Sequence, residues 1–182
     1  GLVRGAYSLS FTVPEFGSGG GTGTFGFWRM VSDRTNLGLN VSVHTAHLRQ
    51  EIDPDTLPGR EAVESNFSVA AGPALRRYLA PSERLGPFLY GSARAGYTWQ
   101  RRRVDDLTDV RAHGATFEGE AGVGLEWFPT RDVSVSGHTG LRAGLSALSG
   151  EFGNGEFEDR AFTAGTFTAG LSLNLYFRPR GR

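Results

Sequence analysis

The segment 162–177, FTAGTFTAGLSLNLYF, alternates apolar residues with small or polar ones over most of its length. Alternation with a period of two predicts an extended strand whose two faces differ in polarity. In a soluble sheet the apolar face packs in the core, whereas in a membrane-spanning barrel it faces lipid. The fold class of the chain, and with it the function, therefore depends on which way that face points.

Strand-like segments recur along the whole chain, without convincing helical periodicity. No run of about 18 apolar residues occurs, so the sequence predicts no membrane-spanning helix. We expect eight strands, at residues 2–13, 22–31, 37–49, 65–78, 88–100, 115–128, 133–147 and 161–177.

The connections between these segments alternate in length. Short turns are expected at 32–36, 80–86 and 129–132, and longer polar loops at 14–21, 50–64, 101–114 and 148–159. This alternation is typical of an up-and-down barrel with turns at one end and mobile loops at the other. A strand of about 11 residues at about 40° tilt spans roughly 25–28 Å, the height of an outer-membrane apolar band. Nothing marks a second domain, so residues 1–182 are expected to form one barrel domain.

The ionisable residues of the strands fall mainly on one parity. In the last six strands the odd-numbered positions carry no ionisable residue, when the third strand is counted only over 37–43 and Arg77 is set aside. Arg77, like Arg29 in the second strand, lies near a strand end, where a long side chain can reach the headgroups. The opposite parity carries charged residues among many Gly, Ser and Thr. It predicts an inward-facing charge network of Arg4, His44, Arg94, Glu118, Glu120, Glu126, His138 and Arg142.

The width of an eight-stranded barrel decides which parity faces inward. Its interior barely accommodates side chains, so rows of Leu, Phe, Tyr and Trp do not fit there. The glycine-rich set fits better and lets opposite charges pair across the lumen. An Arg on the lipid side near mid-membrane would cost about 2–4 kcal/mol. The sequence thus favours an inverted barrel, with a soluble sandwich or a soluble ligand-binding barrel as the alternatives.

Aromatic residues gather near the predicted short turns. Aromatic side chains concentrate at membrane interfaces, because the ring is apolar and, in Trp and Tyr, it also carries a polar group. We therefore expect lipid-interface aromatics at this end, with core aromatics of a soluble sandwich as the alternative. They are Trp28, Tyr78, Phe88, Trp127, Phe128, Tyr176 and Phe177.

Several classes of function are disfavoured. The formal net charge is zero, so no basic field points to nucleic acid, and the absence of cysteine removes thiolate metal sites. The G-x-G-x-x-G match at 21–26 runs into a strand rather than the helix that a dinucleotide site needs. A lipid-modifying barrel would need a His/Ser/acid set on the outer wall, with a His-x-Ser spacing. His44 and His138 instead carry the inward parity, and neither begins that spacing. We predict no catalytic residues, no metal and no cofactor.

Three segments resemble a known group of proteins. YLAPSERLGPFLYGSARAGYTW (78–99) and GVGLEWFPTRDVSVSGHTGLRAG (122–144) look like hairpins of small bacterial outer-membrane β-barrels, the OmpA-, OmpX- and OmpW-like and opacity-type group. AGLSLNLYF (169–177) is similar to their closing strand. The resemblance implies an integral outer-membrane protein whose Phe177 is the signal read by the barrel-assembly machinery, although five residues follow it here. The first residues, GLVRGAYSLS, lack a secretory leader pattern, so an exported chain would be numbered here in its mature or trimmed form.

The combined expectation is an eight-stranded antiparallel transmembrane barrel with a non-enzymatic role. It would serve membrane structure or surface interaction through four long external loops, with a lumen filled by charged side chains. A narrow channel or a transporter of small hydrophobic solutes is the alternative. The expected partners are membrane lipid, the barrel-assembly machinery, a protein bound by the loops, and lipopolysaccharide phosphates near Arg101, Arg102 and Arg103.

Overall fold

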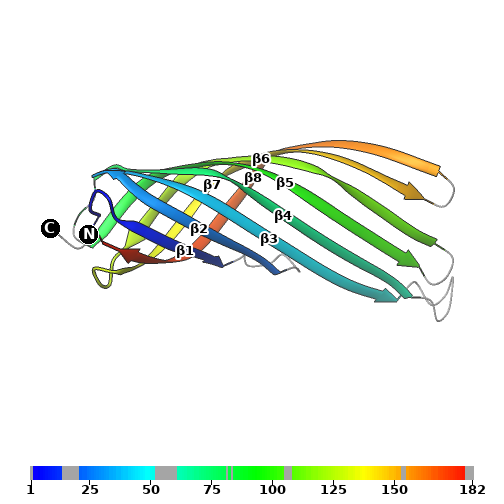
Figure 1. The fold of residues 1–182 in the computed structure, drawn as a ribbon, viewed down its shortest axis with the longest axis horizontal. Helices are drawn as coiled ribbons and strands as arrows, with labels where there is room; N and C mark the ends of the chain where they lie inside the picture. Colours follow the sequence, from blue (N-terminus) through cyan, green and yellow to red (C-terminus); the bar gives the residue numbers. More distant parts are fainter. Residues whose placement is uncertain are drawn as a thin grey trace.

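The computed structural model is a closed antiparallel β-barrel, and it describes residues 2–13, 21–51, 61–80, 82, 84–104, 108–152 and 155–178. Each strand pairs with its neighbour in sequence, and β1 pairs with β8 to close the circle (Figure 1). The strands are β1 (Tyr7–Val13), β2 (Gly21–Ser32), β3 (Thr35–Glu51), β4 (Glu61–Tyr78), β5 (Leu85–Val104), β6 (Thr108–Trp127), β7 (Val133–Phe152) and β8 (Gly155–Phe177). The predicted fold class and strand order are confirmed. The described residues hold no helix that meets the length and apolarity needed to cross a membrane.

The outer wall of the barrel is apolar and its interior is polar. Leu171 and Val123 are 47% and 54% exposed, whereas Arg94 is only 7% exposed. This is the reverse of a soluble protein, in which large apolar side chains leave water. The inversion predicted from residue parity is confirmed, and the soluble alternatives are excluded.

The strands differ greatly in length, and the longer ones continue past the apolar band. β1 has 7 residues and β8 has 23. In Figure 1, β3 to β8 reach far beyond β1, at the end opposite the chain termini and the short turns. The barrel therefore carries a sheet-like extension at its long-strand end.

The prediction of long loops at 101–114 and 148–159 was wrong. β5 continues to Val104 and β6 begins at Thr108, while β7 ends at Phe152 and β8 begins at Gly155. Residues 50–51 and 61–64 also lie in strands, whereas 14–20 and 52–60 lie outside the described residues. Beyond the bilayer both faces of a strand meet water, so the apolar–polar alternation that marks a strand fades.

A bulge in β8 shifts the alternation of faces. The register changes between Arg142, which pairs with Thr166, and Ala143, which pairs with Ala164. Above this point Phe162 lies opposite Leu145 on the outer row and is 68% exposed. The expectation that 161 and 163 belong to the lipid-facing row was therefore wrong, because one extra residue exchanges the two faces.

Candidate functional site: the lumen and its closed end

Glu126 is the centre of a buried polar network at the short-turn end of the lumen. Its Oε2 accepts a hydrogen bond of 2.5 Å from the Tyr78 hydroxyl, and its Oε1 accepts one of 2.8 Å from the Tyr176 hydroxyl. The Ser134 hydroxyl also donates to Oε1. The carboxylate is completely buried, so these donors replace the water that it loses.

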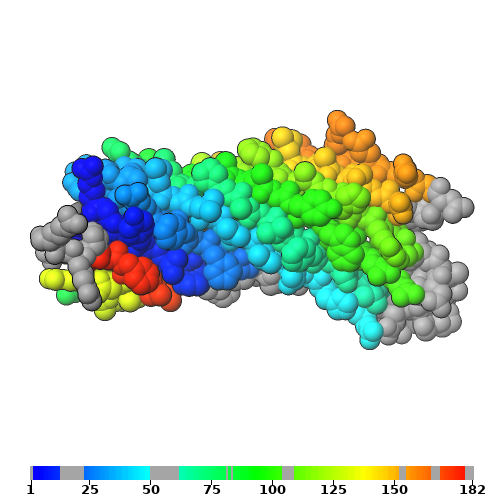
Figure 2. Space-filling model, in the orientation of Figure 1, coloured from blue at the N-terminus to red at the C-terminus, as the bar shows by residue number. Residues whose placement is uncertain are grey.

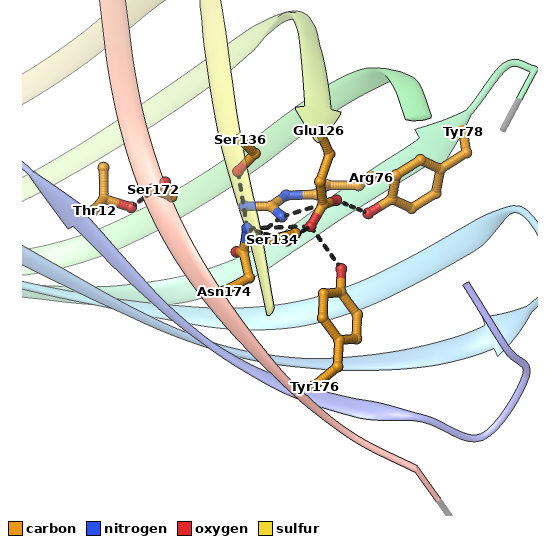
Figure 3. A network of polar contacts seen from close by, with 9 residues as sticks. All are labelled: Thr12, Arg76, Tyr78, Glu126, Ser134, Ser136, Ser172, Asn174 and Tyr176. Atoms are coloured by element: carbon orange, nitrogen blue, oxygen red, sulfur yellow. Dashed lines mark hydrogen bonds and ion pairs between the residues drawn. The ribbon is translucent and has the colours of Figure 1, made fainter. Parts of the chain in front are cut away.

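Asn174 and Arg76 extend this network across the barrel (Figure 3). Asn174 Nδ2 donates to Glu126 Oε1 at 3.1 Å and also contacts the hydroxyls of Ser134 and Ser136. Arg76 Nη1 donates to Asn174 Oδ1 at 3.3 Å and lies 3.9 Å from Glu126 Oε2. Strands β4, β6, β7 and β8 are thereby tied together inside the lumen.

Aromatic rings fill the space around the Arg76–Glu126 pair. The Arg76 guanidinium carbon lies 4.3 Å from the Trp28 ring centre and 5.3 Å from that of Phe88. Gly38 and Gly124 make this possible, because a Cβ at either position would overlap the ring of Trp28 or Phe88. Charge and rings together form a plug, defined here as Trp28, Arg76, Tyr78, Phe88, Glu126, Phe128, Asn174 and Tyr176.

Most of the expected lipid-interface aromatics are part of this plug. Trp28, Tyr78, Phe88, Phe128 and Tyr176 are all buried, so their assignment to the lipid interface was wrong. Trp127 and Phe177 do lie on the outer wall, 51% and 54% exposed. The parity that sorts the charged residues also separates these two groups, since the five buried aromatics have even numbers.

A second cluster lies nearer the middle of the lumen and surrounds Glu120. His138 Nε2 lies 3.5 Å from Glu120 Oε1, and Arg142 and Arg94 lie 3.7 and 3.8 Å from Oε2. Arg94 also donates to Glu118 at 3.1 Å. The structure thus brings together five members of the predicted charge network, and Glu126 belongs to the separate plug.

The remaining two predicted network members lie elsewhere. His44 lines the same cavity as the Glu120 cluster. Arg4 is exposed in a turn before β1 and does not enter the lumen. Its assignment was wrong because the first strand begins at Tyr7, not at residue 2.

The lumen contains a polar cavity of about 270 Å³ above the plug. Trp28, Arg76 and Tyr90 line it together with the Glu120 cluster. Its other walls are mainly hydroxyl and small side chains, including Ser10, Thr12 and Ser172. Such a lining suits water and small polar solutes rather than an apolar ligand.

The outer wall holds two features that the sequence reasoning missed. Phe67, Tyr97 and Trp99 are exposed on β4 and β5, at the far end of the apolar wall from Trp127. They form a second aromatic boundary for the lipid band. The signal was present in the sequence, since all three carry the outward parity.

A charged cluster lies directly beyond this second boundary. Arg101 donates two hydrogen bonds to Asp109, of 2.8 and 2.7 Å, and Arg111 Nη2 donates another of 2.9 Å. The hydrogen bonds from Arg101, and then those from Arg111, hold the pKa of the Asp109 carboxyl well below its usual range. Arg102 has the opposite parity and lines a groove with Val110, Glu156 and Phe157.

One histidine–serine contact lies on the outer side of the extension. His47 Nδ1 and Ser65 Oγ are 3.0 Å apart. Within the described part of the chain, no carboxylate bonds to His47 to orient it, as a nucleophile–base–acid set requires. The described residues also form no group of three or more side chains suited to a metal ion.

Solved structures with the same architecture exist, although no family model matches the sequence and comparison with curated proteins finds no match. The chain is similar to Ail, the attachment invasion locus protein of Yersinia pestis, with a TM-score of 0.54, 16% identity, and coverage of 96% of this chain and 100% of Ail. It is also similar to a major outer membrane protein from Thermus thermophilus, with a TM-score of 0.59, 12% identity, and coverage of 96% and 100%. The outer membrane protein AlkL gives a TM-score of 0.50 at 16% identity, covering 100% of this chain and 94% of AlkL.

The chain has the fold of the small outer-membrane β-barrels of OmpA, OmpX and OmpW type. These comparisons establish the architecture, and the distribution of apolar and polar side chains establishes the membrane environment. An outer-membrane barrel needs an apolar outer wall and a polar lumen, and this barrel has both. It is therefore an integral protein of the bacterial outer membrane.

Proposed function

We propose that this outer-membrane barrel is a non-enzymatic protein that anchors an extracellular strand extension for surface interactions. The observation that carries the proposal is the plug, which occupies the lumen at the short-turn end. Trp28, Tyr78 and Phe88 are each only 1% exposed, and Glu126 is fully buried beside them. An eight-stranded barrel has no spare width for a pore around such side chains.

The strand extension provides an exposed surface for contacts with other molecules, whereas the lumen is plugged. On β5 to β8 the strands continue through residues 101–104, 108–113, 147–152 and 155–161, and carry exposed charged side chains such as Arg111 and Glu158. A rigid paired sheet positions such groups better than a loop of the same length. The predicted surface role therefore moves from flexible loops to the ends of the strands.

Electrical recording across a planar bilayer tests the plug. The refolded wild-type barrel is expected to show no steady current above that of the bare membrane. The double substitution Trp28→Ala and Phe88→Ala removes both rings beside Arg76 and should open a measurable conductance. Trp127→Ala, which removes a ring from the outer wall, is the matched control. A steady open conductance in the wild-type protein would contradict the proposal.

A narrow channel is the second candidate, and the polar cavity above the plug favours it. Water can fill the cavity as far as the Glu120 cluster, so an ion path would need only the plug to rearrange. In that case Arg94→Ala and Glu120→Ala should change the conductance. Unchanged traces in both variants would exclude gating by this cluster. The polar lining gives no support to a hydrophobic-solute route.

We also propose two partners that would contact the outer wall. Arg101 and Arg103 lie just beyond Trp99, at the level where lipopolysaccharide phosphates would meet an arginine side chain. Phe177 ends β8 on the outer wall and pairs with Tyr7, as a closing residue recognised by the assembly machinery would. Phe177→Ala should slow insertion in cells while leaving refolding into micelles unchanged. Equal insertion rates would exclude this role.

A further inference from the structure

A single row of the sheet crosses the extension with two arginines followed by two glutamates. Arg101 on β5 pairs with Arg111 on β6, Arg111 with Glu151 on β7, and Glu151 with Glu156 on β8. Directly paired residues project from the same face of a sheet. Trp99, two positions before Arg101, lies on the outer wall, so this row faces outward.

The neighbouring positions reinforce the separation of charge. The basic sector, defined as Arg101, Arg103, Asp109 and Arg111, has three arginines and one aspartate and thus a formal charge of +2. The acidic sector, defined as Glu151, Glu156, Glu158 and Arg160, has three glutamates and one arginine and thus −2. In Figure 2, green β5–β6 and orange β8 lie at the same end of the molecule. The two sectors are equal in size, opposite in sign, and carried by adjacent strands.

The outer wall below both sectors is apolar. Below the acidic sector, Leu141, Leu145 and Phe162 project from β7 and β8, each more than half exposed. Below the basic sector, Tyr97 and Phe117 project from β5 and β6, 48% and 53% exposed. The two walls can therefore pack against each other inside the membrane.

We propose that the basic sector of one barrel docks on the acidic sector of a second copy of this chain within the membrane. The inference rests on the proposed surface-interaction function and names its partner. The two sectors are adjacent on one face, so a two-fold contact brings the basic sector of each copy against the acidic sector of the other. Charge complementarity would set the orientation, with the paired apolar walls below.

Lipopolysaccharide alone explains the pattern less well. Lipid phosphates surround a barrel on every side, and they would repel the acidic sector as strongly as they attract the basic one. A second copy matches both sectors at once. The net charge of the whole chain is zero, so self-association meets no overall repulsion.

Site-specific disulfide cross-linking tests the contact, because the chain contains no cysteine. Ser65→Cys places a thiol in the row of Arg101, and Ser149→Cys places one in the row of Glu158. The two variants are refolded together into phosphatidylcholine vesicles and oxidised. The mixture should give about tenfold more linked dimer than either variant alone, and the yield should fall as salt rises from about 0.05 M to about 1 M.

Charge reversal provides the decisive control. Arg101→Glu with Arg111→Glu in the Ser65→Cys chain should abolish the linked dimer formed with a Ser149→Cys partner. Glu151→Arg with Glu156→Arg in that partner should restore it, because the opposite signs again face each other. Heat-modifiable migration shows that each variant is folded. Equal yields in all mixtures, or no restoration, would overturn the proposal.

Vesicles that contain lipopolysaccharide test the alternative explanation, in which the basic sector binds lipid phosphates. If Arg101→Glu with Arg111→Glu loses lipopolysaccharide binding and no mixture ever cross-links, the basic sector serves lipid and the second-copy proposal fails. Neither result changes the conductance of the barrel, so failure of this inference is distinguishable from failure of the plugged-lumen function.

Discussion

The guanidinium of Arg76 lies over the Trp28 ring at 4.3 Å and within 3.9 Å of Glu126 Oε2. One face of a buried cation thus meets a π system while its edge meets a carboxylate and Asn174. Both kinds of contact gain strength where water is excluded. The plug is therefore a single connected unit. Removal of one member leaves its partners buried without the contacts that compensate their charge or polarity.

We expect Glu126→Ala to destabilise the barrel by about 3–5 kcal/mol, because it leaves the buried charge of Arg76 uncompensated. Urea unfolding of the refolded protein in vesicles measures the loss. Glu118→Ala is the matched control, since Glu118 is 37% exposed and pairs with an arginine that keeps Glu120. It should cost under about 1 kcal/mol. Equal losses in the two variants would contradict the connected plug.

Tryptophan fluorescence distinguishes the interior ring from those on the outer wall. Quenchers attached to lipid acyl chains should reduce the emission of Trp99 and Trp127, both exposed on the wall, and leave Trp28 unaffected. Proteins that retain a single tryptophan, with the other two changed to Phe, report each ring separately. Quenching of Trp28 to the same extent would place its ring at the lipid interface after all.

Residue parity predicted the inverted barrel because lipid imposes a strict alternation on every membrane-spanning strand. The same parity places Trp28, Tyr78 and Phe88 inside, but their aromatic character suggested the membrane interface instead. The strand extension beyond Trp99 was hidden for the opposite reason, since both of its faces are polar enough to resemble loops. The bulge near Ala164 falls at Gly165, but the chain has 27 glycines, so this one did not single out the bulge.

The pairing of Asp109 with Arg101 should persist far into acid. Its lowered pKa means that the ionised, paired form is favoured at neutral pH and is lost only as the pH falls through that lowered value. Carboxyl NMR of the protein in micelles should show Asp109 still ionised below about pH 3.9, the ordinary value for aspartate. Arg101→Gln should raise its midpoint. A wild-type midpoint at the ordinary value would refute the assignment.

The non-enzymatic role that we propose predicts no hydrolysis at the His47–Ser65 contact. Neither wild-type protein nor Ser65→Ala is expected to release fatty acid from phospholipid or lipopolysaccharide vesicles. Thin-layer chromatography of the lipids checks this. Fatty-acid release by the wild type that disappears in Ser65→Ala would make the barrel an enzyme.

The contacts within the plug could not be predicted from residue parity. Parity places Glu126 in the lumen, yet its partners Tyr78 and Tyr176 come from strands far away along the chain. Which inward residues meet depends on strand tilt and register around the whole circle, and no local pattern encodes these. The Glu120 cluster was easier to foresee because Glu120 and Arg142 are directly paired.

In the described part of the chain, the seam between β1 and β8 has seven residue pairs, from Tyr7–Phe177 to Val13–Leu171, and a side-chain hydrogen bond joins Thr12 to Ser172 inside the lumen (Figure 3). It joins the two ends of the chain, so it has the largest loop to close and should zip last as the protein folds. When the barrel is destabilised, β1 and β8 should separate first at this short seam and leave an open, curved sheet.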